Sequence, residues 1–384
     1  MGQVYSIINR KFTEANKINL ATYRQQLIND LTSGNIKVDD AYYYMNNINI
    51  DSRGKISCTQ KNIQCQPCDN EKIVKYLKQS KSGTLTLKLC DATRCDYQFS
   101  VIIHNYNTGS FLPLMDPRRP ENVDSSLLFM FYNDFILRNV SPHFIIPIAH
   151  FDCTNKLGEK IVKAIVTEHA DGGFISEYIS DPSMWDVLIF QVLYTLASIY
   201  NFYPEFRHRR SIINNWKIRR TQSSDKFNIY KVKDEKIFIL PDVGFQVVMT
   251  NFSSASIPHL IDNDQPYGIR VRNALPDKYP LHDISTFASS TIQTLSSDEK
   301  SEKSLPVNFR DLLKSVTTSR KDSDAGEIYT LDPLTLLIKA TATCANAKSA
   351  ICTFGTLLKQ FDRNRRTLDD LKNAGKIKIE YYIP

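Results

Sequence analysis

Apolar and polar residues alternate along the segment 84–89, and this period of two residues predicts a β-strand with one buried face. A similar run at 97–104 predicts a second strand, and the segment 90–95 between the two strands has the composition of a turn. Short runs rich in Ile and Val predict further strands, which lie at 144–148, at 161–167 and, as two strands around a turn at 241–244, within 227–250.

The clearest helical pattern lies at 183–200, where apolar residues recur at the spacing of one helix face. A second amphipathic stripe predicts a helix at 121–139. Additional helices are predicted at 16–31, 38–45, 283–295, 307–317, 332–346 and 348–361, with a polar surface loop at 296–304. Strands with one helix come first and helices dominate afterwards, so the sequence predicts an α+β fold with segregated lobes.

Composition adds limits to this picture. The chain has 384 residues, with 42% hydrophobic and 23% charged residues, which is ordinary for a globular protein with a large core. The net charge of +7 is mild and its basic residues are scattered, so we expect a solvated surface and no specific nucleic-acid site. The longest apolar run, 184–200, contains Asp186 and Gln191 and is predicted to be a buried helix rather than a membrane span. We expect no secretory signal peptide.

The first residues match a lipidation pattern. The sequence M-G-Q-V-Y-S fits M-G-x-x-x-[ST], and Arg10 and Lys11 follow it. Removal of Met1 would expose Gly2 for N-myristoylation, although two fixed positions also arise by chance. A single myristoyl chain binds membranes only marginally, so membrane attachment through Gly2 would need a second contact.

Cysteines gather in the first third of the chain. Cys65 and Cys68 form a C-x-x-C pair, and Cys90 and Cys95 form a second pair with a longer spacing. Four thiolates in this order predict a tetrahedral zinc site, and the alternative is a set of free thiols. Because the eight cysteines are sparse and uneven, we expect reduced thiols and a cytosolic setting.

The segment 206–215 reads F-R-H-R-R-S-I-I-N-N and has the frame of a protein-kinase catalytic loop, H-R-D-x-x-x-x-N. His208 and Asn215 occupy the His and Asn positions, and Arg210 stands where the catalytic Asp belongs. That Asp accepts the proton of the substrate hydroxyl, and the Asn binds Mg²⁺. An arginine cannot accept a proton at any relevant pH. The loop therefore predicts a kinase fold and argues against its usual chemistry.

Several weaker motifs occur in the order expected of a kinase. They lie at 119–124 (R-P-E-N-V-D), 141–148 (S-P-H-F-I-I-P-I), 167–173 (T-E-H-A-D-G-G), 206–215, 238–252 and 280–283 (P-L-H-D). On these segments the chain resembles the protein-kinase-like family of large nucleocytoplasmic DNA viruses, over roughly residues 80 to 300. The resemblance implies a bilobal fold, a hinge-like segment that contains Glu168, a structural role for His208, and an Asp283 that braces the catalytic loop.

The resemblance also exposes departures from an active kinase. The metal-binding Asp-Phe-Gly motif aligns with N-F-S at 251–253, so Asn251 replaces a carboxylate. A glycine-rich phosphate loop is not recognisable. The strand that should carry the phosphate-pairing lysine has none, and His104 is its nearest cationic candidate. The helix partner of His104 would be Glu121 or Asp124, and the sequence does not decide between them.

A shifted alignment offers another metal ligand. Asp242 begins the triplet D-V-G after an apolar run, so a change of register would make it the metal-binding Asp. A hairpin turn at Pro241 is the competing interpretation. If the register is changed in this way, ATP and Mg²⁺ would be bound by five residues: His104, Asp124, Glu168, Asn215 and Asp242.

We therefore predict an α+β, protein-kinase-like fold with a small β-rich N-lobe and a mostly helical C-lobe. The expected organisation is an N-terminal helical arm at 1–50, an N-lobe with a cysteine-containing insertion at 51–166, and a C-lobe at 167–384. The favoured function is a catalytically inactive viral pseudokinase that acts as a binding, structural or regulatory module and has no cofactor.

The expected partners are viral proteins and, through Gly2, a membrane. The expected location is the host cytoplasm or the viral factory. Analogy with the family adds the virion as a further location. The alternatives are a divergent active Ser/Thr kinase that uses ATP and Mg²⁺, and a zinc-stabilised interaction domain.

Overall fold

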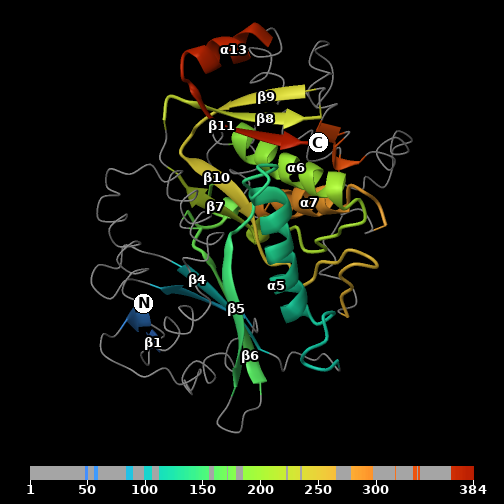
Figure 1. Cartoon of the computed structure of the whole chain (residues 1–384). Helices are drawn as coiled ribbons and strands as arrows, with labels where there is room; N and C mark the ends of the chain where they lie inside the picture. The colour runs from blue at the N-terminus through green and yellow to red at the C-terminus, as the bar shows by residue number, and fades with distance from the viewer. Residues whose placement is uncertain are drawn as a thin grey trace. The chain divides into compact units, whose positions relative to one another are not determined.

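We analysed a computed structural model of the chain (Figure 1). The structure describes residues 48–50, 56–58, 84–89, 99–105, 112–154, 160–170, 172–178, 185–221, 224–233, 236–264, 278–296, 316, 332–334, 336–337 and 365–384. The predicted helices at 16–31, 38–45 and 348–361 and the turn at 90–95 lie outside these residues. So do the predicted loop at 296–304, except for residue 296, and most of the predicted helices at 307–317 and 332–346.

Two compact units make up the chain. Unit 1 contains Met1–Tyr132 and Ile145–Asp171, and unit 2 contains Asn133–Phe144 and Gly172–Pro384. Strands with one helix form the described part of unit 1, and unit 2 combines helices with short sheets, which agrees with the predicted α+β class. The predicted divisions after residues 50 and 166 stay predictions.

Unit 1 is built on a four-stranded antiparallel sheet in the order β3-β4-β6-β5. Its strands are β3 (Thr84–Leu89), β4 (Phe99–Asn105), β5 (Pro147–Thr154) and β6 (Lys160–Glu168). The alternating segments at 84–89 and 97–104 are therefore strands, as predicted. A separate antiparallel pair joins β1 (Ile48–Ile50) to β2 (Ile56–Cys58).

Helix α5 (Pro120–Phe131) belongs to the same unit and contacts β5. Pro120 occupies its first turn, where the missing N–H of proline costs no hydrogen bond. Both apolar and polar residues of this helix are buried, including Leu127, Leu128 and Phe131. The predicted helix at 121–139 is thus shorter in α form, and it continues as a π-helical turn at Tyr132–Ile136.

The predicted strand at 144–148 is wrong in its position. Phe144 makes only an isolated bridge with Met249 of unit 2, and β5 begins at Pro147 and runs on to Thr154. The backbone of Ile146 is used differently, because its N–H and its carbonyl both bond Glu168. Phe144 and Ile146, which the pattern places in a strand, therefore make separate backbone contacts ahead of β5.

Helix α6 (Trp185–Phe202) forms the centre of unit 2, and its residues from Val187 to Ile199 are buried. It contacts β10 (Phe245–Met249), where Gln191 accepts a hydrogen bond from the N–H of Val247 at 2.6 Å. The predicted helix at 183–200 is confirmed. A second predicted helix is α7 (His282–Ser296), in agreement with the pattern at 283–295.

The region 216–250 departs from the sequence prediction. β10 pairs antiparallel with β7 (Trp216–Arg220), a strand that the pattern did not indicate. β8 (Phe227–Val232) and β9 (Lys236–Pro241) pair with each other. The predicted hairpin between the strands around Pro241 is therefore wrong, because each of these strands has its partner elsewhere.

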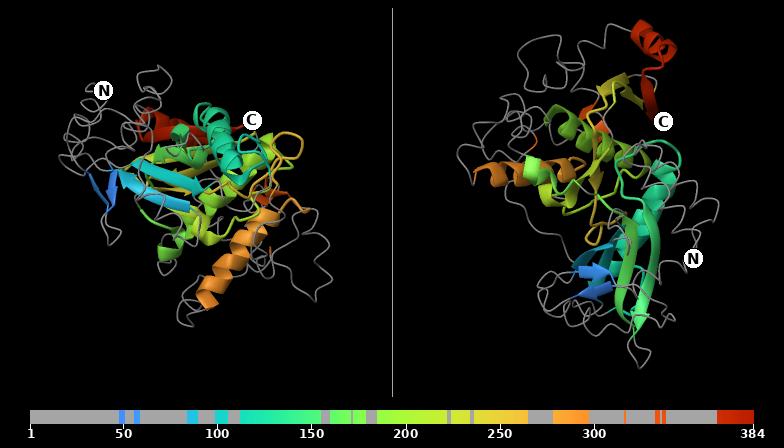
Figure 2. Two further views of the ribbon diagram at one scale, coloured as in Figure 1. Left: turned by 90° about the horizontal axis from the view of Figure 1, so that it is seen from below. Right: turned by 90° about the vertical axis from the view of Figure 1, so that its left-hand side faces the viewer.

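The C-terminal residues complete the second sheet of this region. β11 (Ile377–Ile383) lies parallel to β8, which gives the order β11-β8-β9. Helix α13 (Arg365–Asn373) contributes Leu368 to a cluster with Ile229 and Ile239 of the sheet. Figure 2 shows these red C-terminal elements beside the yellow strands β8 and β9.

The opposite face of this sheet meets an aromatic core. Tyr230 of β8 is fully buried, stacks on His143 with ring centroids 5.7 Å apart, and contacts Tyr194 of α6 edge-on at 4.8 Å. His143 also hydrogen bonds the carbonyl of Val247. His143 is therefore a packed core residue, as a histidine between apolar segments predicts.

Gly172 marks a close approach of two segments within unit 2. Its N–H donates to the carbonyl of Ile218, and an added Cβ would lie 2.6 Å from the Ile218 side chain. Only glycine fits at this distance. Within the described part of the chain, no helix combines the length and the apolar content that a membrane span requires.

Candidate functional site

The catalytic-loop segment of unit 2 follows helix α6 and is anchored at its first residues. Arg207 forms an isolated antiparallel bridge with Ser256, with both N–H···O distances at 2.9 Å. The two segments 207–215 and 251–256 therefore lie next to each other. They carry the residues that align with the catalytic loop and with the metal-binding motif of kinases.

Asp283, in the first turn of α7, braces this loop. Its carboxylate oxygens accept hydrogen bonds from the backbone N–H of His208 at 2.8 Å and of Arg209 at 3.1 Å. Arg209 has a φ of 61°, which is the left-handed region that non-glycine residues rarely adopt. A buried carboxylate that accepts two N–H groups stabilises such a turn. The brace expected from the kinase resemblance is present.

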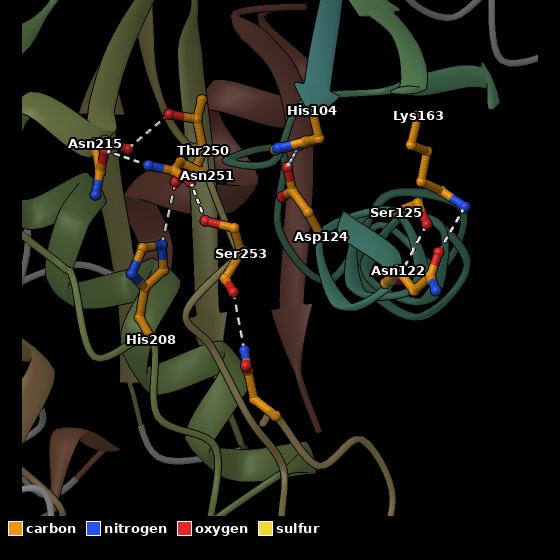
Figure 3. Close-up of polar contacts among 11 residues, drawn as sticks. His104, Asn122, Asp124, Ser125, Lys163, His208, Asn215, Thr250, Asn251 and Ser253 are labelled. Atoms are coloured by element: carbon orange, nitrogen blue, oxygen red, sulfur yellow. Dashed lines mark hydrogen bonds and ion pairs between the residues drawn. The ribbon is translucent and has the colours of Figure 1, made fainter. Parts of the chain in front are cut away.

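His208 points inward and is fully buried. Its Nε2 hydrogen bonds the carbonyl of Thr250 at 3.1 Å (Figure 3). The centroid of its ring lies 5.3 Å from that of Phe252. A histidine held in this way joins the loop to the segment after β10. This is the structural role that the resemblance implied for His208.

Asn215 is the centre of a compact hydrogen-bond network (Figure 3). Its amide nitrogen donates to the carbonyl of Arg210 at 2.6 Å, and its amide oxygen accepts from the amide nitrogen of Asn251 at 3.1 Å. Asn251 in turn accepts from the hydroxyl of Ser253 at 2.8 Å. The carbonyl of Asn215 accepts from both N–H and hydroxyl of Thr250.

The residues of this network do not fit a magnesium ion. Mg²⁺ in phosphoryl-transfer sites is held through carboxylates, and both side chains at the aligned positions are neutral amides. Each amide oxygen, the atom that could ligate a metal, already accepts a hydrogen bond from a neighbouring side chain. Asn215 and Asn251 are thus hydrogen bonded to each other, at the positions where a kinase presents ligands to the metal.

Arg210 occupies the position of the catalytic acid. It is half-buried, and this burial lowers the pKa of its guanidinium. Its Nε is buried and makes no hydrogen bond to any described residue. The loop therefore carries a partly desolvated cation at the point where phosphoryl transfer needs a proton acceptor.

Asp242, the alternative metal ligand, belongs to a different arrangement. Its Oδ2 lies 2.6 Å from Nζ of Lys378 on β11 and accepts a hydrogen bond from the hydroxyl of Ser224 at 2.8 Å. Both members of the ion pair are largely buried, with side-chain exposures of 3% and 10%. These contacts indicate that Asp242 is an ion-paired carboxylate that holds strand β11 in place. They speak against a role as a metal ligand.

In unit 1, His104 of β4 pairs with Asp124 of α5. The distance from Nε2 to Oδ2 is 2.8 Å, and both side chains are buried (Figure 3). Glu121, the other candidate partner, lies 3.3 Å from the guanidinium of Arg119. The structure thus places Asp124 opposite His104, in a strand-to-helix pair that resembles the Lys–Glu pair of active kinases in its position only.

Lys163 is a site residue that the sequence did not single out. It lies directly opposite His104 in the β4–β6 register, is buried, and donates to the amide oxygen of Asn122 at 2.9 Å. The side chains of His104 and Lys163 thus reach from adjacent strands to the first turns of α5. A lysine inside the apolar run 161–167 was the available signal, since a buried strand rarely carries an unpaired charge.

Glu168 also has a structural contact. Its carboxylate accepts from the N–H of Ile146 at 3.0 Å, and its own N–H donates to the carbonyl of Ile146. The next residue, His169, hydrogen bonds the hydroxyl of Ser100. A nucleotide-binding role for Glu168 stays a prediction.

The proposed zinc ligands Cys65, Cys68, Cys90 and Cys95 lie outside the described residues, as does Gly2. Among the described residues there is no group of three or more His, Cys, Asp or Glu side chains that could hold a metal ion. The zinc site and the lipidation of Gly2 both stay predictions.

The two-unit α+β fold and the braced H-x-x-x-x-x-x-N loop define a protein-kinase-like chain. Over 228 residues it is 27% identical to a protein of Acanthamoeba polyphaga mimivirus whose name is "Putative serine/threonine-protein kinase". The match covers 49% of this chain and 48% of the mimivirus protein, so it spans about half of that relative. The resemblance to kinase-like proteins of large nucleocytoplasmic DNA viruses is confirmed.

Two further comparisons complete the picture. No model of a protein family matches the chain. A solved structure of a divergent Toxoplasma kinase, which lacks the glycine-rich loop and regulates membrane ultrastructure of the parasitophorous vacuole, is 13% identical. It aligns with a TM-score of 0.34 and covers 78% of this chain and 92% of its own.

Loss of the Asp283 brace should destabilise unit 2. In Asp283→Asn the amide nitrogen cannot accept a hydrogen bond, so one buried N–H of the loop loses its partner. We expect the free energy of unfolding to fall by about 1–3 kcal/mol, measured by urea denaturation. Asp262→Asn, at an exposed position of the same unit, is the control and should change it by less than about 0.5 kcal/mol. Equal effects of the two substitutions would contradict the brace.

The His104–Asp124 pair should show energetic coupling. A double-mutant cycle with His104→Ala and Asp124→Ala should give a coupling energy of about 1–3 kcal/mol, because the two groups are buried and in direct contact. The pair Arg138 and Asp134, at 3.5 Å and with side-chain exposures of 63% and 17%, is more open to solvent and serves as the control. Its cycle should give about 0.5 kcal/mol or less. A His104–Asp124 coupling near zero would show that the contact does not stabilise the fold.

Proposed function

We propose that this chain is a non-catalytic, kinase-fold module of a large DNA virus that acts through binding or regulation. The observation that carries the proposal is the Asn215–Asn251 hydrogen bond beneath a loop whose acid position is Arg210. The scaffold of the catalytic loop is kept, and the groups that perform phosphoryl transfer are replaced.

Phosphoryl transfer depends almost entirely on positioning and on electrostatic stabilisation by metal ions. A neutral amide at residue 251 removes the charge that holds the metal, and Arg210 removes the proton acceptor. Either loss alone would slow transfer, and the two together affect independent parts of the machinery. The retained Asp283 brace indicates that the loop serves a purpose that needs its shape.

The alternative of an active Ser/Thr kinase relies on Asp242 as a metal ligand. Its contacts with Lys378 and Ser224 speak against this role, because a metal ion would have to displace a buried lysine. The mimivirus relative is named as a kinase. Similarity to it supports a kinase-like fold, but a shared fold does not imply a shared activity.

Binding to viral protein partners is part of the proposal, as are myristoylation at Gly2 and a location in the host cytoplasm, viral factory or virion. The M-G-x-x-x-S pattern supports the lipid, and the remaining points rest on the viral kinase-like resemblance. An intact-mass measurement of the chain, co-expressed with an N-myristoyltransferase, tests the lipid directly, with Gly2→Ala as its control.

The purified chain should transfer no phosphate. With radiolabelled ATP, Mg²⁺ or Mn²⁺, and a mixture of Ser- and Thr-containing peptides, we expect label in peptide and chain to remain at the level of an Asn215→Ala control. Wild-type label that exceeds this control, and that is lost on substitution of Asn215 or Asp242, would show a divergent active kinase and refute the proposed function.

A further inference from the structure

Strand β9 lies at one edge of the sheet β11-β8-β9, and in the described structure it pairs with β8 alone (Figure 1). The N–H of Asp242 donates to the carbonyl of Lys226, so these two opposed residues form a hydrogen-bonded pair. Bonded and non-bonded pairs alternate along an antiparallel ladder, and the even-numbered residues of β9 therefore direct their backbone groups at β8. It follows that Ile237 and Ile239 direct their N–H and carbonyl groups away from β8.

The contacts on the other side of β8 agree with this assignment. The N–H groups of Phe227 and Lys233 donate to carbonyls of the C-terminal segment, so odd-numbered residues of β8 face β11 and even-numbered residues face β9. At the outer edge of β11, the N–H of Tyr382 donates to the carbonyl of Asn139. The outward backbone groups of β9 form no such hydrogen bond within the described part of the chain.

The side chains of β9 are held on both faces of the sheet. Ile239 is buried and packs in the cluster with Leu368 of α13, and Phe238 is buried on the opposite face. Ile237, on the same face as Ile239, is 39% exposed. A well-held edge strand with an exposed apolar residue and unused backbone groups is a template for pairing with another strand.

The sequence of β9, K-I-F-I-L-P, suits pairing with a second copy of itself. In an antiparallel pair centred on Phe238, Ile237 of each copy lies opposite Ile239 of the other, and these opposed pairs exchange both of their N–H···O bonds. A shift toward the C-terminal end would place Pro241, which has no N–H, opposite Ile237. A shift the other way would use residue 235, which precedes the strand. The edge is therefore self-complementary in one register, and this favours a second copy as its occupant.

We propose that the chain forms a twofold-symmetric dimer in which the β9 edges of two copies pair antiparallel. The exposed Ile237 of each copy packs beside Ile239 of the other, on the face that α13 contacts, and extends the apolar cluster there. A twofold contact uses the same edge on both copies, so it closes and leaves no β9 edge for a third copy. This surface lies outside the catalytic-loop segment, and the inference does not depend on the proposed function.

The experiment is sedimentation-velocity ultracentrifugation of the full chain over a range of concentrations. One strand pair is a small interface, so we expect a reversible dimer with a dissociation constant of about 1–100 µM. Ile237→Pro removes an N–H that points away from β8, so it leaves the β8–β9 ladder intact. It should weaken the dimer about 10- to 100-fold, because the symmetric contact loses this hydrogen bond twice.

A second variant, Ile237→Lys, keeps every backbone group and places a charge against the apolar side chains of the other copy. It should weaken the dimer about 10-fold or more. Its matched control is Val243→Lys, because Val243 is also 39% exposed and lies beyond the end of β9. This control should leave the dissociation constant unchanged, and circular dichroism melting establishes that each variant is folded.

Hydrogen exchange of the unmodified chain tests the same contact without a variant. Exchange of the Ile237 and Ile239 amides should slow as the concentration rises through the dissociation constant. The proposal is overturned by a chain that stays monomeric at about 300 µM, which leaves the edge to a different protein. It is also overturned by a dimer in which these two amides exchange at the monomer rate, or by one that Val243→Lys weakens as much as folded Ile237 variants do.

Discussion

The pair of hydrogen bonds from His208 and Arg209 to Asp283 is the constraint on which the site depends. A left-handed Arg209 costs about 1–3 kcal/mol, and bonds to a charged acceptor are worth about 1.5–3 kcal/mol each, so the brace is sufficient to offset the strain. The brace fixes the backbone of the loop at its start, and this sets the backbone positions of Arg210 and Asn215 that follow.

The two units show the same replacement of charge by neutral or weaker groups. In unit 2 an amide–amide hydrogen bond between Asn215 and Asn251 takes the place of metal ligands. In unit 1 His104 pairs with Asp124, where an active kinase has a lysine and a glutamate. Each of these two pairs holds its segments together, because its buried polar groups hydrogen bond each other. Under the proposed function, a kinase-like framework persists without the charges that phosphoryl transfer uses.

The local parts of this account could be predicted from the sequence. The period of two at 84–89, the helical stripe at 183–200 and the spacing from His208 to Asn215 are properties of neighbouring residues. Long-range pairing could not be predicted in this way. The partner of β10 is β7, and β8 pairs with the C-terminal strand β11 as well as with β9. The hairpin expected at Pro241 is therefore not formed, although the strands on both sides of it are present. The choice of Asp124 over Glu121, and the role of Lys163 opposite His104, likewise needed the sheet register and the position of α5.

The central claim is that the catalytic loop keeps its shape and has lost its metal site. Electron paramagnetic resonance of Mn²⁺, titrated into the full chain with and without ADP, counts free and bound metal directly. The account predicts that the chain adds no Mn²⁺ site to those of the nucleotide in solution, and that Asn251→Asp creates one. A wild-type Mn²⁺ site that disappears in Asn215→Ala would contradict it.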